Sequence, residues 1–275
     1  KKLELQPGEA VRLLYLLGEG GVQSGRAMRE KYTPERADQD FARLAAFWED
    51  KLACLQVDTP NEGMNTELNI WNLYQSEINV MFSRFTSFIE VGGRVGLGYR
   101  DTAQDAMMVV HSNPDKCRSR IVELLRALTK RGYGLHLFEP RWFEPEEKPQ
   151  SFKSPTVVPT PDKSQIVHGL KDACADDALW LVSSIVQYIR ETGELDFADC
   201  MVTYADGGEG TVYEHMCRIL DFSAQEVGAN GVCKGLRADW NDCLNLGGGE
   251  SAMVSFLHYW ALGNFAALAR RATAS

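Results

Sequence analysis

The chain has 275 residues, 44% of them apolar and 24% charged, which is ordinary for a soluble globular protein. Its formal charge is −9 and no run of Lys or Arg forms a basic stripe, which argues against nucleic acid and anionic membranes as partners. No apolar stretch approaches the roughly 20 residues that are needed to span a bilayer.

The N-terminal residues 1–20 are predicted to form strands. Leu3 and Leu5 alternate with charged residues, a turn follows them, and residues 11–17 form a mostly apolar run. Residues 18–25 contain several glycines and are expected to be a flexible join. The chain starts without Met and stops just after a strong helical pattern, so we expect both ends to be cut from a longer protein.

After this join the pattern is helical almost everywhere. Thr33 and Pro34 form a good helix start, and Phe41, Leu44 and Trp48 then recur at helical spacing. Further helices are predicted over residues 66–84, 101–111, 115–131, 176–192, 211–227 and 251–271. Long irregular stretches separate them at residues 85–100, 139–169 and 229–250. Loops of this length are usually functional or disordered, and their Arg, Asp and Trp content favours function.

Helices joined by alternately short and long loops suggest stacked helical hairpins. The best fit is a mainly α toroid with its long loops gathered at one end. A plain helical bundle is the structural alternative.

Cysteine and histidine spacing argues against a metal site and a disulfide framework. The seven Cys residues are scattered, odd in number and never spaced as C-x-x-C, and the five His residues form no H-E-x-x-H pair. We therefore expect no metal, no cofactor, and a reducing, cytoplasmic location. His136 and His215 have no partner in the sequence, so each is expected to be a buried, hydrogen-bonded structural residue. Cys243 is expected to be a packed thiol.

One candidate binding segment precedes the helix predicted over 101–111. Gly96 and Gly98 would let the backbone approach a ligand closely, and Arg94, Arg100 and Asp101 place charged groups around them. A phosphate loop is a weak match, because no Gly-Lys-Ser/Thr follows. The alternative is a glycine turn that leads into a helix cap, with solvated arginines.

A second candidate lies in the glycine-bounded loop 238–250, where two Asp residues flank Trp240 and Asn241. Carbohydrate sites often pair an indole, which packs on a sugar ring, with a carboxylate that binds hydroxyls or transfers a proton. A carboxyl group beside an indole in a dry cleft can stay protonated near neutral pH and act as an acid. The alternatives are a cation-binding loop, although EF-hand spacing is lacking, or a cluster of Asx turns.

Taken together, three blocks resemble glycoside hydrolase family 94, whose members are inverting phosphorylases of β-linked disaccharides and oligosaccharides. The blocks are Ser83-Arg84 with Gly93-Arg94 and Gly98 to Asp105, then Asp176 to Leu181, and then Ala238 to Asn245. Residues 137–140 and 153–161 resemble members that act on N,N'-diacetylchitobiose. Members that act on cellobionic acid or cellobiose are the alternatives.

The resemblance implies an N-terminal β-sandwich, a helical linker and an α/α barrel of six hairpins. Residues 1–25 would end the sandwich, 26–60 would form the linker, and 61–275 would form the first half of the catalytic barrel. Much of the phosphate site would then lie outside this chain, so the isolated piece is expected to be inactive. Family members are often dimers, which implies a homodimer for the full-length enzyme.

The resemblance also assigns roles to individual residues. Asp242 matches the catalytic acid, which protonates the glycosidic oxygen while inorganic phosphate attacks the anomeric carbon from the opposite face. Phosphate is a co-substrate and is already an anion, so no catalytic base is needed. Arg94 and Asp101 match donor-sugar positions, and Trp240 would stack beside the scissile bond. Further substrate-binding candidates are Arg84 and Arg100.

Two other classes of function stay open from the residues alone. A helical-toroid hydrolase would use Asp242 together with a second carboxylate such as Asp101 or Asp239. A carbohydrate-binding module would bind sugar without turnover. The presence of Asp242 argues against the binding module, because such a module has no need for an acid there.

Overall fold

A computed structural model describes residues 3–18, 20–82, 96–143 and 173–272. The chain is mainly helical, and its strands are two to four residues long. The helices are α1 Val22–Lys31, α2 Pro34–Leu52, α3 Glu62–Thr66, the π-helical η1 Glu67–Trp71, α4 Asn72–Phe82, α5 Tyr99–Met108, α6 Pro114–Arg126, η3 Pro140–Phe143, α8 Asp177–Thr192, η5 Leu195–Asp199, α9 Val212–Gln225 and α10 Ala252–Ala272. The strands are β1 Leu97–Gly98, β2 Leu137–Phe138, β3 Met201–Thr203, β4 Glu209–Thr211, β5 Lys234–Leu236 and β6 Gly247–Glu250.

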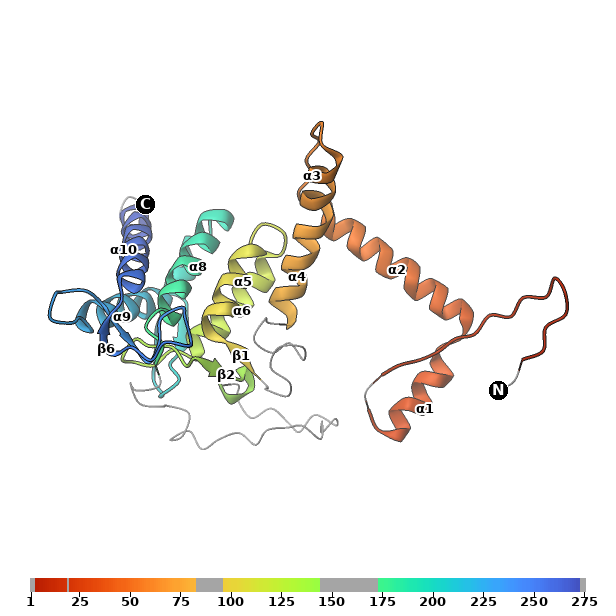
Figure 1. Cartoon of the computed structure of the whole chain (residues 1–275), viewed down its shortest axis with the longest axis horizontal. Coiled ribbons are helices and arrows are strands. Elements are labelled where there is room, and N and C mark those ends of the chain that lie inside the picture. Colours follow the sequence, from red (N-terminus) through yellow and green to blue (C-terminus); the bar gives the residue numbers. More distant parts are fainter. Residues whose placement is uncertain (1–2, 19, 83–95, 144–172, 273–275) are drawn as a thin grey trace.

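The N-terminal helices stand away from the rest of the molecule (Figure 1). Helices α1, α2 and α3 contain no buried residue. Helix α2 begins as the sequence predicts, because the Thr33 side chain accepts a hydrogen bond from the Arg36 amide and Pro34 follows it. Amphipathic periodicity without burial means that these helices present their apolar side chains to solvent in this chain.

Strands are expected over residues 1–20, but none forms over residues 3–18. Residues 3–18 have no strand partner among the described residues, and only the turn at Pro7 and Gly8 matches the prediction. An alternating pattern favours a strand but cannot supply the neighbouring strand that its backbone groups need. The glycine-rich join expected over 18–25 is also shorter than predicted, because helix α1 starts at Val22.

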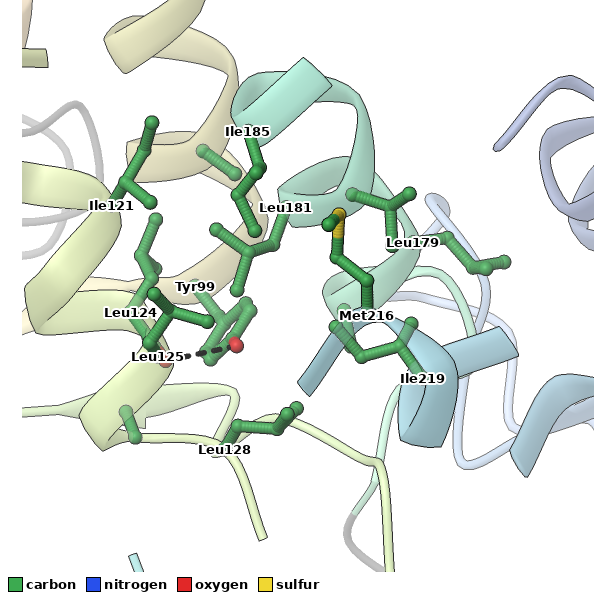
Figure 2. Packing of buried hydrophobic residues seen from close by; sticks show 14 of the residues in the cluster. Tyr99, Ile121, Leu124, Leu125, Leu128, Leu179, Leu181, Ile185, Met216 and Ile219 are labelled. Carbon is green, nitrogen blue, oxygen red and sulfur yellow. Dashed lines mark hydrogen bonds between the residues drawn. The ribbon is translucent and has the colours of Figure 1, made fainter. Parts of the chain in front are cut away.

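The hydrophobic core is built around α8, which packs against α5, α6, α9 and α10. Figure 2 shows the centre of this core, where Tyr99 and Leu181 lie between side chains of the surrounding helices. The hydroxyl of Tyr99 donates a hydrogen bond to the carbonyl oxygen of Leu124 at 2.9 Å. This contact joins the start of α5 to α6 and therefore helps to fix the position of Arg100, the next residue in the chain.

Most helix boundaries agree with the sequence prediction. Helix α8 ends where expected, with Gly193 in the left-handed conformation (φ 78°). Helix α9 starts with a capping box, in which Thr211 and Glu214 satisfy each other's backbone amides. Helix α6 is shorter than predicted and ends at Arg126. Leu128 instead pairs with Gly134 in a tight turn, which satisfies the backbone groups that a longer helix would have used.

The three two-stranded pairings are all antiparallel. Strand β1 pairs with β2, and β5 pairs with β6 inside the loop that was predicted to be irregular over 229–250. Strands β1, β2 and β6 lie at the same end of the helical body (Figure 1). The first turns of α5 and α8 start at this end, so the candidate segments gather there.

Helix α10 differs from the sequence expectation in one respect. The segment Ala252–Arg271 of this helix contains an 18-residue window with a mean hydropathy of 1.2, so by length and composition the helix could span a membrane. The sequence analysis expected no stretch of that kind. In the structure this helix packs against α8 and α9, and Val254, Leu257 and Ala261 are buried in the core.

Replacing Gly132 by Ala is expected to destabilise the helical body more than replacing Gly193 by Ala. Both glycines have positive φ, 104° and 78°, so both variants carry backbone strain of about 1–2 kcal/mol. A Cβ atom at Gly132 would lie 2.1 Å from the carbonyl oxygen of Arg218, whereas the space around Gly193 is open. Overpacking should therefore add about 1–3 kcal/mol at Gly132 only. Thermal denaturation of the two variants measures the difference, and equal melting temperatures would contradict it.

Candidate active site

At the candidate site, two segments that are far apart in the sequence are joined by backbone hydrogen bonds. The amide of Ala175 donates to the carbonyl oxygen of Ala238 at 2.9 Å, and the amide of Arg237 donates to that of Ala173 at 3.1 Å. These bonds hold the segment before α8 against the loop that carries Asp242. The start of α8 and the candidate acid are therefore brought to the same place by backbone hydrogen bonds.

Arg100 lies at the centre of the site, in the first turn of α5. Its Nη1 donates to Oδ1 of Asp176 at 3.1 Å and to the carbonyl oxygen of Asp239 at 2.8 Å, and its Nη2 donates to Oδ1 of Asp242. The residue is only 5% exposed. In this structure the guanidinium connects α5, α8 and the Asp242 loop. Its predicted role in substrate binding stays a prediction.

The loop around Asp242 combines two possibilities that the sequence left open, a cluster of Asx turns and a carboxyl group available for chemistry. Oδ1 of Asp239 accepts the amide of Asn241 at 3.0 Å, and Oδ1 of Asn241 accepts the amide of Cys243 at 3.1 Å. Both are Asx turns, and Oδ2 of Asp239 also accepts the Ser251 hydroxyl at 2.9 Å. Asp239 and Asn241 thus shape the loop. The side chain of Asp242 takes part in no Asx turn and is 50% exposed, as a group that reacts with a ligand must be.

Two adjacent carboxylates, Asp176 and Asp177, are buried beside Arg100, and both are 0% exposed. Burial and the negative charge of Asp177 raise the pKa of Asp176 to about 6, against the opposing effect of Arg100. Burial lowers the pKa of Arg100, but the charges of Asp176 and Asp177, together with the hydrogen bond and charge of Asp242, outweigh it and hold that pKa above its ordinary value. Oδ2 of Asp176 also accepts the Trp180 indole at 3.1 Å. In the sequence this pair belongs to one of the three blocks that resemble the family, but no role could be assigned to it there.

His136 has a partner that the sequence did not reveal. Its Nδ1 lies 3.0 Å from Oδ2 of Asp177, in an ion pair that is largely buried. Burial lowers the pKa of His136, but the charge and hydrogen bond of Asp177, with a smaller contribution from Cys174, outweigh it and raise the pKa to about 11. The expectation of a hydrogen-bonded histidine is confirmed. Because 41 residues separate His136 from Asp177, no local motif could have indicated the pair.

The remaining predicted residues are placed as follows. Asp101 follows Arg100 on α5 and is half-buried, and Trp240 is 58% exposed two residues before Asp242. Arg84 and Arg94 lie outside the described residues. His215 is fully buried, and its Nδ1 lies 2.8 Å from the carbonyl oxygen of Thr211, as expected for a structural histidine.

The thiols are all free, and one of them differs from expectation. Cys243 is exposed, not packed, because the two Asx turns hold its segment at the surface. Cys174 is buried close to His136 and Asp242. No sequence pattern singles out Cys174, because it is 68 residues from Asp242 in the chain.

Residues 47–275 match the family described as the glycosyl hydrolase 94 superfamily, catalytic domain. The chain is 58% identical over 272 residues to the N,N'-diacetylchitobiose phosphorylase of Vibrio proteolyticus, a match that covers 98% of this chain and 34% of that protein. It is 57% identical over 274 residues to the protein of the same name from Vibrio furnissii, again over 98% of this chain and 34% of that protein.

A more distant relative is the solabiose phosphorylase of Paenibacillus borealis, which is 29% identical over 272 residues, 97% of this chain and 31% of that protein. The chain thus spans about a third of the length of the curated relatives that it matches. The family match covers α4 to α10 completely, including every described residue of the candidate site. On this evidence the chain belongs to the glycosyl hydrolase 94 superfamily.

Proposed function

We propose that this chain is part of a longer inverting disaccharide phosphorylase that acts on a β-1,4-linked disaccharide of the N,N'-diacetylchitobiose type. The products would be an α-sugar 1-phosphate and a free sugar. The identity of 57–58% to two proteins named N,N'-diacetylchitobiose phosphorylase supports the substrate class. The observation that carries the reaction type is Asp242, a half-exposed carboxyl group with one oxygen held by a buried guanidinium.

Asp242 acts as the general acid in this proposal. Because Arg100 donates to Oδ1, the transferable proton belongs on Oδ2, and the carboxyl group has a defined orientation. The proton passes to the glycosidic oxygen as its bond to the anomeric carbon breaks. Phosphate forms the new bond from the opposite face, through an oxocarbenium-like transition state, which inverts the configuration. The phosphate anion needs no carboxylate base.

The other sequence-predicted residues bind substrate in this scheme. Asp101 and Arg94 bind hydroxyl groups of the donor sugar, Arg84 matches a further family position for that subsite, and Trp240 stacks beside the scissile bond. The high exposure of Trp240 supports this assignment, since a stacking indole must be open to a ligand. Arg100 contributes mainly by positioning Asp242. No cofactor takes part, and phosphate is the co-substrate.

The domain organisation is part of the same proposal. Residues 61–275 would supply the first half of an α/α toroid, 26–60 a helical linker, and 1–25 the end of a β-sandwich. The exposed apolar side chains of α2, among them Phe41, Leu44 and Phe47, support a linker that packs on a further domain. A cytoplasmic location and a homodimer of the full-length enzyme complete the proposal.

Phosphate consumption by a full-length enzyme that contains this chain tests the function. The enzyme is offered N,N'-diacetylchitobiose, cellobiose and cellobionic acid in separate reactions. We expect an α-sugar 1-phosphate from the first. Formation of that product only from cellobiose or cellobionic acid would replace the proposed substrate but keep the reaction. Release of free sugar without phosphate consumption would overturn the phosphorylase and favour an inverting hydrolase.

A further inference from the structure

Three side chains with different donor atoms meet beside Arg100. A ring nitrogen of His136, the sulfur of Cys174 and a carboxylate oxygen of Asp242 all lie within 4.8 Å of one another. They come from the turn after α6, the segment before α8 and the Asp242 loop. The backbone pairing of residues 173–175 with 236–238 brings the last two together. We call these three residues the His136 cluster.

The surroundings of His136 resemble those of a metal-binding histidine. Metal-bound imidazoles usually direct their second ring nitrogen at a carboxylate, which fixes the ring and its tautomer. Here Nδ1 lies 3.0 Å from Oδ2 of Asp177, so Nε2 is the nitrogen suited to a metal. Asp177 is fully buried, and its Oδ1 has no hydrogen-bond partner within the described part of the chain. A buried carboxylate of this kind is stabilised by additional positive charge nearby.

The net charge of the site also favours a cation. Three carboxylates, Asp176, Asp177 and Asp242, surround one guanidinium, that of Arg100. Metal binding requires a neutral imidazole, so His136 must first release the proton that Asp177 stabilises. Asp176, Asp177, Asp242 and Arg100 then carry a net charge of −2, and a bound thiolate adds one more negative charge. A divalent cation would offset most of this charge. The guanidinium opposes the cation, but the carboxylates outnumber it.

The donor set selects the kind of metal. A combination of imidazole nitrogen, thiolate sulfur and carboxylate oxygen is typical of zinc, whereas Mg²⁺ and Ca²⁺ prefer oxygen ligands alone. Ligand atoms around a tetrahedral zinc ion lie roughly 3.3–3.7 Å apart, so the cluster would contract by about 1 Å on binding. Asp242 can supply this movement, because its side chain is half exposed on a loop. A water molecule would take the fourth position.

We propose that Zn²⁺ binds His136, Cys174 and Asp242 reversibly and thereby inhibits the enzyme. The inhibition rests on the proposed function, since it requires Asp242 to be the general acid, whereas the binding does not. A carboxylate that coordinates zinc cannot deliver a proton to the glycosidic oxygen. The Arg100 contact and the zinc contact are compatible, because each can use a different oxygen of Asp242.

The binding is tested on a full-length enzyme that has been treated with a chelator and transferred to phosphate-free buffer. Titration with Zn²⁺ is followed by calorimetry, and titration with Co²⁺ is followed by the near-ultraviolet absorption of a cobalt–thiolate bond. We expect one ion per chain and a thiolate band. Cys174→Ser should abolish the band and weaken Zn²⁺ binding by at least about 10–100-fold, the usual cost of disturbing a metal site.

Cys243→Ser is the matched control, because this exposed thiol lies next to Asp242 but outside the cluster. It should keep both the band and the affinity. If Cys174→Ser fails to fold, Asp242→Asn is the second variant, which should weaken Zn²⁺ binding but keep the thiolate band. Loss of the band in Cys243→Ser, or unchanged zinc binding in Cys174→Ser or Asp242→Asn, would overturn the proposal.

Inhibition is measured in the synthetic direction, from sugar 1-phosphate and free sugar, so that added phosphate does not sequester the metal. We expect Zn²⁺ to inhibit, a chelator to restore the rate, and Cys174→Ser to resist inhibition. An enzyme that is active with chelator but neither binds Zn²⁺ nor is inhibited by it would contradict this inference and leave the proposed function intact. Cys174-dependent binding in an enzyme without phosphorylase activity would contradict the proposed function alone.

Discussion

Asp242→Asn is expected to lower the rate of phosphorolysis of the natural disaccharide by about 10²–10⁴-fold, the usual contribution of a general acid. The amide preserves the size of the side chain but has no acidic proton that it could transfer to the leaving oxygen. Sugar binding should change little, because Asp242 acts on the bond being broken. The measurement is kcat and KM of the full-length enzyme, with the loss falling on kcat.

Two comparisons sharpen this prediction. Asp199→Asn removes an exposed carboxyl group on η5, outside the site, and should leave kcat unchanged. A substrate with a phenolic leaving group needs little protonation, so Asp242→Asn should lose much less activity on it than on the disaccharide. A variant that keeps more than roughly a tenth of its rate on the natural substrate would show that Asp242 is not the acid.

Arg100→Met is expected to have the largest effect on stability, a loss of about 3–5 kcal/mol, as is usual when one partner of a buried ion pair is removed. The side chain of Arg100 is 6% exposed and that of Asp176 is 0% exposed, so solvent cannot replace the lost guanidinium. Activity should fall as well, because Asp242 loses the group that orients it. Thermal denaturation of the full-length enzyme and its kcat measure the two effects.

Asp176→Asn provides the matching test. The double variant Arg100→Met/Asp176→Asn removes both charges of the buried pair. No unpaired Asp176 carboxylate is then left behind, so part of the lost stability should return. The kcat should stay low, because Asp242 still lacks its donor. Arg190→Met, on the exposed side of α8, should change stability by less than about 0.5 kcal/mol. A double variant that is less stable than the sum of its single changes predicts would contradict the pairing of Arg100 with Asp176.

The amino-acid sequence determines the helices of this protein, because the signals that start and end a helix act within a few residues. Thr33 and Thr211 each bond an amide three residues later, and Gly193 supplies the left-handed residue after α8. Strands are different, since they require a partner elsewhere in the chain. The alternating pattern of residues 1–20 therefore indicated strands that the described residues do not pair.

The sequence also indicated the type of chemistry, through Trp240 and Asp242 in one loop. Only the tertiary structure shows that Asp239 and Asn241 shape this loop while Asp242 stays open to solvent. Asp239, Asn241 and Asp242 are all polar and lie within four residues, so their local chemistry alone offers no means of distinguishing their roles. Their roles differ because the side chains of Asp239 and Asn241 accept hydrogen bonds from the loop backbone, whereas the side chain of Asp242 accepts one from Arg100.

The assembly of the site is decided by tertiary structure alone. Arg100 and Asp242 are 142 residues apart, and His136 is 41 residues from Asp177. Such pairs depend on the packing of α5 against α8 and on the hydrogen bonds between the Asp242 loop and the segment before α8. Local patterns specify elements, whereas the charge balance around Asp242 depends on which elements meet, and that follows from how their apolar faces fit.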